Sequence, residues 1–229
     1  MILSFRKIAI FIIGFSLVAS KENDTYNYNI NLRGIPVANC IVSYSDTLLS
    51  GLGCKKLDYK VTTNAFIDKI FKIDNHYTVI IDTIQYNTLY YSKISYQPNI
   101  KNDIYTSLID GNLKYSNSNI SINKKDKNIF TVLYLFQSNN FNELNKIDYI
   151  EREGKYYNFN INEHKENQFQ LLIEEINPNN YGVIKNTDIF LWGLFLNKSN
   201  NKIIMDNNNQ YISKCVVNKG LTVITAKLR

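Results

Sequence analysis

Histidine and cysteine are the side chains best suited to metal binding or nucleophilic chemistry, and this chain has few of them. Its two histidines, His76 and His164, each lie in a polar, turn-like context without further ligands at the close spacing of a metal site. The cysteines form no Cys-x-x-Cys pair, which excludes the usual thiol oxidoreductase motif. The sequence also has no Gly-flanked serine elbow and no Gly-rich phosphate loop. We therefore expect no metal site and no cofactor, and we assign no catalytic residue.

Carboxylates are the remaining candidates for acid–base chemistry. Glu151 and Glu153 are two residues apart next to a hairpin tip, so they share one face of a strand, where a solvated charge is the ordinary interpretation. A glycoside hydrolase needs two carboxyl groups that face each other across a cleft. Folding could bring together Asp82, Asp110 or Glu151 in this way. A hydrolase of envelope polymers is therefore an alternative, although the sequence favours a protein that is not an enzyme.

The three cysteines, Cys40, Cys54 and Cys215, are candidates for a disulfide if the chain is exported. Side-chain parity opposes a Cys40–Cys54 bond. The even-numbered residues of 38–44 form one apolar face, whereas the odd-numbered residues of 57–61 form the apolar face of the next strand. A hairpin that joins these faces pairs even with odd positions, so Cys40 cannot lie directly opposite Cys54 without a bulge. Cys215 could pair with either, and three unpaired thiols are the expected state.

Apolar and aromatic side chains are the other candidate binding groups. One set belongs to an expected helix, and the second belongs to the apolar run Ile189–Leu196. They could line an apolar cavity inside a bent sheet, as in barrels that hold small ligands, or they could simply fill the core. The candidate ligand-binding residues are Val132, Leu133, Phe136, Phe190, Trp192 and Phe195.

The elements that must position these groups are mostly strands, because period-two alternation dominates the chain. Apolar residues at positions 129, 132, 133 and 136 predict a helix over Ile129–Gln137. The run Ile189–Leu196 is apolar on both faces and predicts a central strand covered on both sides. Residues 64–73 predict a short helix or an irregular strand. We expect a mainly β fold, an antiparallel bent sheet or open barrel of about ten strands with one or two short helices on its concave side.

The N-terminal segment predicts export. Arg6 and Lys7 precede the apolar run Ile8–Val18, and small residues follow at the positions that a signal peptidase reads. We interpret residues 1–20 as a signal peptide rather than a retained anchor, because the run is shorter than the roughly 20 apolar residues of a membrane span. Residues 21–229 show no repeat or composition shift and are expected to form a single β-rich domain without a transmembrane helix. The expected location is the periplasm, or else an extracellular or outer-membrane-associated position.

The charge balance does not identify a partner. Without the two basic residues of the leader, 24 basic residues face 20 acidic ones, a net charge of +4. The basic residues are dispersed rather than interleaved with stacking aromatics along a stripe, which argues against nucleic-acid binding.

Several features follow one another along the chain: Tyr26–Cys40 with its strand-Gly-Ile-Pro-strand opening, Ile81-Asp82, Asp110-Gly111, the Phe130–Phe136 helix, Trp192 and the final strand after Gly220. Their order resembles an uncharacterised family of exported bacterial proteins, domain of unknown function 3108. The resemblance implies a signal peptide followed by a β-rich domain, and it carries no catalytic residue. The chain departs from the family pattern at Ala38-Asn39, at Gln137 and over residues 198–205.

These observations lead to one functional hypothesis and two alternatives. The leading hypothesis is an exported, non-enzymatic β domain of the cell envelope. It would bind an apolar or amphipathic ligand, such as a lipid-like molecule, or an envelope protein against the concave face of its sheet. The alternatives are the hydrolase described above and a structural or adhesive surface module.

Overall fold

The computed structural model describes residues 24–116, 118–177, 182–196, 198–208 and 210–229. The predicted signal peptide, residues 1–20, lies outside the described residues. Every described strand, and the core that the strands enclose, lies after residue 23.

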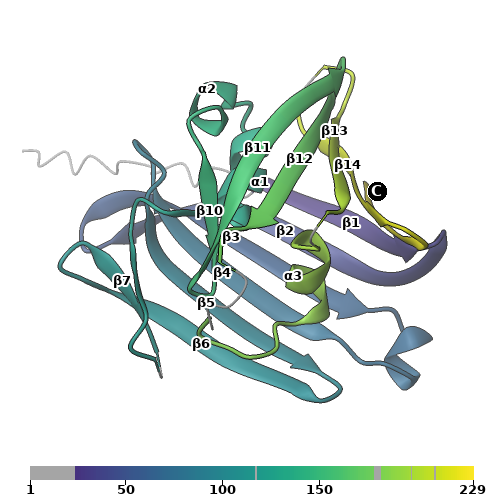
Figure 1. Cartoon of the computed structure of the whole chain (residues 1–229), viewed down its shortest axis with the longest axis horizontal. Coiled ribbons are helices and arrows are strands. Elements are labelled where there is room, and N and C mark those ends of the chain that lie inside the picture. Colours follow the sequence, from purple (N-terminus) through teal and green to yellow (C-terminus); the bar gives the residue numbers. More distant parts are fainter. Residues whose placement is uncertain (1–23, 117, 178–181, 197, 209) are drawn as a thin grey trace, which may run out of the picture.

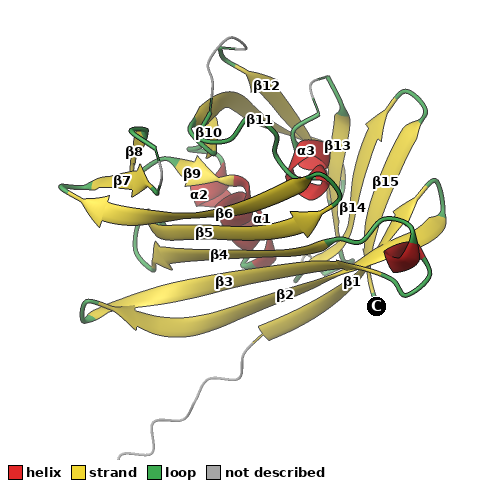
Figure 2. Cartoon of the chain, turned by 90° about the horizontal axis from the view of Figure 1, so that it is seen from below, coloured by secondary structure: helices red, strands yellow, loops and turns green. Residues whose placement is uncertain are grey.

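The described residues form a single curled sheet of fifteen strands with helices on its concave side (Figure 1, Figure 2). The mainly β fold is thus confirmed. It has more strands than the ten expected, because the short strands Ser121–Asn123 and Lys127–Asn128 carry no alternation pattern. The strands are β1 (Asp24–Leu32), β2 (Ile35–Leu49), β3 (Leu52–Thr63), β4 (Asp74–Asp82), β5 (Thr88–Gln97), β6 (Ile100–Ile109), β7 (Asn112–Tyr115), β8 (Ser121–Asn123), β9 (Lys127–Asn128), β10 (Tyr149–Arg152), β11 (Lys155–Lys165), β12 (Gln168–Glu175), β13 (Asn200–Met205), β14 (Ile212–Lys219) and β15 (Thr222–Leu228).

The sheet consists of two antiparallel arms that meet at the ends of the chain. One arm runs from β1 to β8 and the other from β15 back to β9, and β1 pairs with β15 through Tyr28 opposite Leu228. Among the described pairs, β9 with β10 is parallel and the others are antiparallel. Hairpin connections of this kind place successive turns at alternate ends of the strands.

The helix α1 (Ile129–Gln137) fills the concave face, as predicted from its apolar spacing. Asn128 caps its start, and its side chain accepts a hydrogen bond from the backbone N–H of Thr131 at 3.0 Å. Phe130 packs among tyrosine rings of the sheet, with its ring centre 5.0 Å from that of Tyr77. A short helix, α2 (Phe141–Leu144), follows it, and a 3₁₀ turn occupies Ile67–Lys69 within the 64–73 segment.

The prediction of a central strand over Ile189–Leu196 is wrong. Residues Ile189–Leu194 form the helix α3, and Asp188 precedes its first turn. The Asp188 carboxylate accepts hydrogen bonds from the backbone N–H groups of Phe190 and Leu191, so it is a helix N-cap. A short apolar run has no contrast between faces, and periodicity therefore cannot distinguish a buried helix from a buried strand.

The cysteines are unpaired, and the parity argument against a Cys40–Cys54 disulfide is confirmed. Cys40 lies opposite Val61, and Cys54 lies opposite Thr47. The two cysteines are thus seven residue pairs apart along the β2–β3 ladder, on the order of 23 Å. A disulfide requires Cα atoms within about 7 Å.

Candidate functional site

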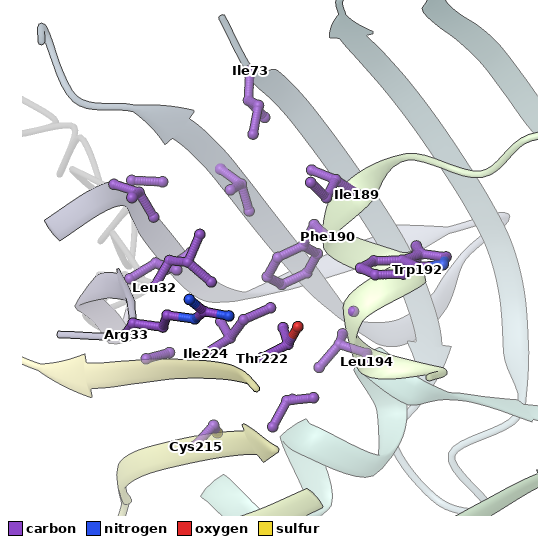
Figure 3. Close-up of a pocket in the computed structure, with 17 residues that line it drawn as sticks. Leu32, Arg33, Ile73, Ile189, Phe190, Trp192, Leu194, Cys215, Thr222 and Ile224 are labelled. Atoms are coloured by element: carbon purple, nitrogen blue, oxygen red, sulfur yellow. The ribbon is translucent and has the colours of Figure 1, made fainter. Parts of the chain in front are cut away.

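The candidate site is an apolar cavity of about 450 Å³ between α3 and the strands β1, β2, β14 and β15 (Figure 3). This volume is within the range of roughly 300–1,000 Å³ typical of ligand sites. Phe190 and Trp192 contribute aromatic rings from α3, and Ile224 and Ala226 contribute aliphatic groups from β15. A ligand that covers these apolar side chains gains about 25 cal/mol for each Å² of apolar surface removed from water.

The exposed lining residues Leu32, Arg33, Ile189 and Trp192 lie at the β1–β2 turn and on α3, so we place the mouth of the cavity between these two segments. Among the described residues that line the cavity, Arg33 alone is charged. Its Nε donates a hydrogen bond to the carbonyl oxygen of Leu221 at 2.7 Å, which fixes the guanidinium beside the opening. Figure 3 shows the Arg33 side chain extending from the turn toward Ile224 and Thr222. The site therefore combines an apolar interior with one cationic group at its entrance.

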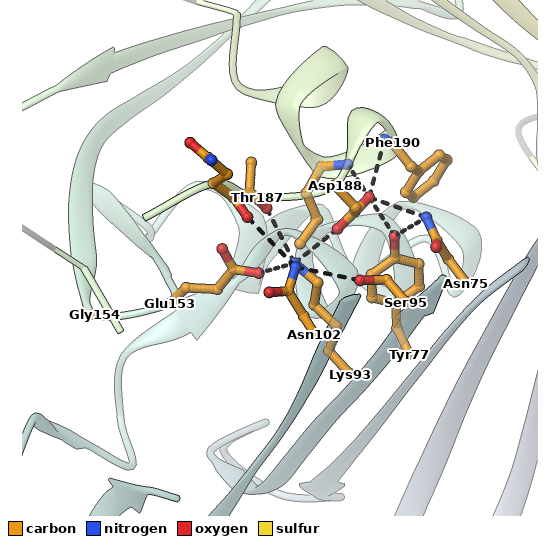
Figure 4. Close-up of polar contacts among 12 residues, drawn as sticks. Asn75, Tyr77, Lys93, Ser95, Asn102, Glu153, Gly154, Thr187, Asp188 and Phe190 are labelled. Carbon is orange, nitrogen blue, oxygen red and sulfur yellow. Dashed lines mark hydrogen bonds and ion pairs between the residues drawn. The ribbon is translucent and has the colours of Figure 1, made fainter. Parts of the chain in front are cut away.

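The helix that forms one wall of the cavity is tied to the sheet by a buried polar cluster (Figure 4). The Oδ1 atom of Asp188 accepts hydrogen bonds from the hydroxyl of Tyr77 at 2.6 Å and from the side-chain amide of Asn75 at 3.2 Å. Burial and the adjacent Asp188 carboxylate raise the pKa of Tyr77, so its hydroxyl retains its proton and donates. The other carboxylate oxygen of Asp188 forms an ion pair with Lys93.

Lys93 is the centre of this cluster. It lies on the inward face of β5, is fully buried, and forms ion pairs with Glu153 as well as Asp188. Its Nζ also donates to the hydroxyl of Thr187 at 3.1 Å. The cluster therefore joins β5, the β10–β11 turn and the start of α3, and so it positions the cavity wall. Sequence reasoning missed it, although a lysine in the apolar phase of a strand is a signal for a buried ion pair.

Comparisons with known proteins do not assign the chain to a family. No family model matches the sequence, and no curated protein matches it. Among solved structures, the chain is similar to a beta-barrel-like protein of domain of unknown function DUF1849 from Brucella abortus. The TM-score is 0.48 at 7% identity, over 90% of this chain and 95% of that chain. The resemblance to domain of unknown function 3108 stays a prediction.

The structure separates the six candidate ligand-binding residues into four groups. Phe190 and Trp192 line the cavity, and Leu133 joins Phe190 in a smaller adjacent hollow of about 80 Å³. Val132 and Phe136 are fully buried in the core. Phe195, the C-cap of α3, is buried, with its ring centre 4.6 Å from that of Tyr157.

Sequence reasoning missed the cavity residues that the strands contribute. These residues include Ile30, Val37, Ala38, Val217, Ile224 and Ala226. The available signal was the small side chains Ala38 and Ala226 at inward positions of strands, where most neighbours are large. Small inward residues leave space that larger side chains would fill.

The carboxylates considered for hydrolysis have separate partners. Asp82 accepts hydrogen bonds from backbone N–H groups of its own turn, including that of Gln85; these outweigh the effect of burial and lower its pKa. Asp110 is exposed in the β6–β7 turn. Glu151 is buried and accepts from the Tyr115 hydroxyl at 2.7 Å. Glu151 is thus enclosed in the core, whereas Asp82 and Asp110 lie at the β4–β5 and β6–β7 turns.

The expectation that Glu151 and Glu153 are solvated is wrong. Both side chains are buried, because the β10–β11 turn folds into the concave side of the sheet. Within the described ranges, no group of three or more histidine, cysteine, aspartate or glutamate residues is placed to hold a metal ion. Among the helices of the described part of the chain, none has the length and apolarity needed to span a bilayer.

Proposed function

We propose that this protein is an exported envelope protein that holds an apolar or amphipathic ligand in the cavity beneath α3. The observation that carries the proposal is the cavity itself, which is open to solvent yet lined almost entirely by apolar side chains. Trp192 leaves 48% of its surface exposed there, although it lies next to a well-packed core. A ligand that covers this surface gains the free energy of removing it from water.

The lining indicates the chemical class of the ligand. Aliphatic side chains from the strands and two aromatic rings from α3 suit a hydrocarbon chain, because they offer no directional polar contacts inside the cavity. Arg33 at the mouth suits an anionic head group, with which a guanidinium forms charge-assisted hydrogen bonds. A fatty acid or a lipid with one inserted acyl chain meets both requirements.

Export is supported by the basic and apolar pattern of the N-terminal segment. We expect the mature protein to begin after Ser20, which intact-mass measurement on protein recovered from the exporting cell would check. Recovery of the full-length chain from the cytosol would contradict export.

Trp192 provides a direct test of ligand binding, because it is the single tryptophan of the sequence and lines the cavity. Dibromostearic acid, whose bromine atoms quench indole fluorescence on contact, should quench Trp192 in a saturable manner. Unmodified stearic acid should reverse the quenching by competition.

Two variants with the same substitution locate the binding site. Ala226→Phe places a large ring on an inward position of β15 inside the cavity and should weaken binding by about tenfold or more. Ala65→Phe makes the same change at an exposed position that does not line the cavity, and it should bind as the wild type does. Equal quenching in both variants, or none in the wild type, would overturn the proposal.

A further inference from the structure

Several turns lie together at one end of the strands, beside the mouth of the cavity. They are the β1–β2 turn, residues 64–73 between β3 and β4, the β5–β6 turn and the β14–β15 turn, and we call them the rim. The strand register places them at the same end of the strands, because Leu32 pairs with Ile224, Ala38 with Thr63, and Asp74 with Tyr96. Figure 1 shows the purple β1–β2 turn close to the yellow β14–β15 turn.

The start of α3 lies at the same end of the strands. The backbone N–H of Ile189 donates to the side-chain oxygen of Gln97, the last residue of β5, at 3.2 Å. Arg33 and Ile73, which belong to two of the rim turns, also line the cavity. The cavity therefore opens among the rim turns.

Large apolar side chains project from the rim into solvent. Phe66 is 73% exposed, Ile70 is 74% exposed and Leu221 is 82% exposed, each on a turn rather than on a strand. Further exposed apolar residues at this end of the strands are Leu32, Ile35, Phe71, Ile189 and Trp192. An exposed apolar group of this size next to a cavity mouth is typical of an interaction surface.

The rim is also basic. Its turns carry three cationic residues, Arg33, Lys69 and Lys72, and the strand ends next to them carry Lys101 of β6 and Lys219 of β14; all five are exposed. The acidic residues of the same stretches are Asp74, the first residue of β4, and Asp68, whose carboxylate accepts a hydrogen bond from the hydroxyl of Thr63. The rim thus presents apolar side chains within a positive field, which complements a surface that is apolar below a layer of anions.

We propose that the rim docks onto the surface of an anionic lipid bilayer, with the mouth of the cavity facing the lipid. Phe66, Ile70 and Leu221 enter the boundary between head groups and acyl chains, and the lysines of the rim bind lipid phosphates. Docking deepens the proposed function, on which it rests for the ligand, because an acyl chain then passes from the leaflet into the cavity without crossing water.

A lipid surface fits the rim better than a protein partner does. The most exposed apolar side chains stand on two separate turns, Phe66 and Ile70 in residues 64–73 and Leu221 in the β14–β15 turn, and cationic residues accompany them at both. They therefore do not form one flat apolar patch that a folded partner could cover. Separate apolar tips flanked by lysine and arginine are typical of interfacial membrane contacts. Trp192, half exposed beside the mouth, is of the residue type enriched at membrane interfaces.

The test is co-flotation of the chain beginning at Lys21 with lipid vesicles, so that the apolar leader does not contribute. The protein should float with vesicles of phosphatidylcholine and phosphatidylglycerol, float less with phosphatidylcholine alone, and detach as salt is raised. The double variant Ile70→Glu/Leu221→Glu should lose most of this binding, about tenfold or more in affinity, because two anionic side chains replace two apolar ones on the rim.

A matched control lies at the opposite end of the strands. Leu48 and Ile84 are 75% and 85% exposed, near the β2–β3 and β4–β5 turns. Leu48→Glu/Ile84→Glu makes the same chemical change and should leave flotation unchanged. Equal flotation of the two double variants would overturn docking at the rim, and so would the absence of wild-type flotation, which would leave the rim to a protein partner.

Docking and ligand binding can fail separately. Ile70 and Leu221 do not line the cavity, so the rim variant should still show quenching of Trp192 by dibromostearic acid in solution. Ala226→Phe should lose this quenching and still float with anionic vesicles. Quenching without flotation would overturn docking alone, and flotation without quenching would overturn the cavity as the ligand site.

Discussion

The Nζ atom of Lys93 lies 2.8 Å from Oδ2 of Asp188, and both side chains are fully buried. This ion pair joins the middle of β5 to the residue that caps α3. A buried ion pair contributes little net stability, but loss of one partner leaves an uncompensated buried charge. Together with the hydrogen bonds from Tyr77 and Asn75 to Asp188, the pair therefore ties the position of α3, and with it the shape of the cavity, to the sheet.

We expect Lys93→Ala to lower the free energy of unfolding by about 3–5 kcal/mol, because it removes the partner of two buried carboxylates. Urea unfolding followed by circular dichroism measures the change. The control is Lys146→Ala, which breaks an ion pair with Glu143 on the surface and should cost less than about 1 kcal/mol. Similar losses in the two variants would contradict the structural role of Lys93.

Glu151 should make stability depend on pH. Burial raises its pKa from 4.5 to about 7, and hydrogen bonds from Gly154 and Tyr115 offset only part of this shift. The folded state therefore binds more protons than the unfolded state between these values. The contribution is fully present below pH 4.5 and is lost as the pH rises through about 7. The shift corresponds to about 3 kcal/mol.

Glu151→Gln tests this dependence, because the amide oxygen can accept the same two hydrogen bonds without a charge. We expect the variant to gain stability relative to the wild type as the pH rises from below 4.5 to above 7, by about 3 kcal/mol over the interval. Urea unfolding of both proteins across this range measures the difference. Parallel stability curves would contradict it.

The local alternation of the strands was predictable from the sequence. The even-numbered residues of 38–44 and the odd-numbered residues of 57–61 are buried together, and Cys40 lies opposite Val61 as the parity argument requires. Period two fixes which face of a strand is buried, since a slip of one residue exposes the whole apolar face. The helix α1 was equally predictable, because its apolar residues follow the helical period.

The cavity and the polar cluster required the tertiary structure. Glu153 is buried because Lys93, sixty residues earlier in the chain, lies on the inward face of another strand. The helical state of residues 189–194 depends on Asp188, a capping residue that an apolar count does not weigh. Long-range pairing decides these features, and local pattern carries little information about it.

The thiols should react slowly in the folded protein. Burial raises the pKa of Cys40 and of Cys215 to about 12, so little reactive thiolate is present near neutral pH. Cys54 is buried and its thiol donates to the carbonyl of Leu52 at 3.3 Å. We expect Ellman's reagent to titrate three thiols in denaturant without prior reduction, and to react slowly without denaturant. Fewer than three thiols in the denatured, unreduced protein would contradict the unpaired state.

Two phenylalanines on the helices should separate stability from ligand binding. Phe136 is fully buried in α1, so Phe136→Ala should cost about 3–5 kcal/mol of unfolding free energy while changing the affinity for dibromostearic acid by less than about twofold. Phe190 is only partly buried and lines the cavity, so Phe190→Ala should cost less stability and weaken binding severalfold. Urea unfolding and quenching of Trp192 measure the two effects on the same samples. A Phe136 variant that unfolds like the wild type but no longer binds the fatty acid would instead place the ligand against α1.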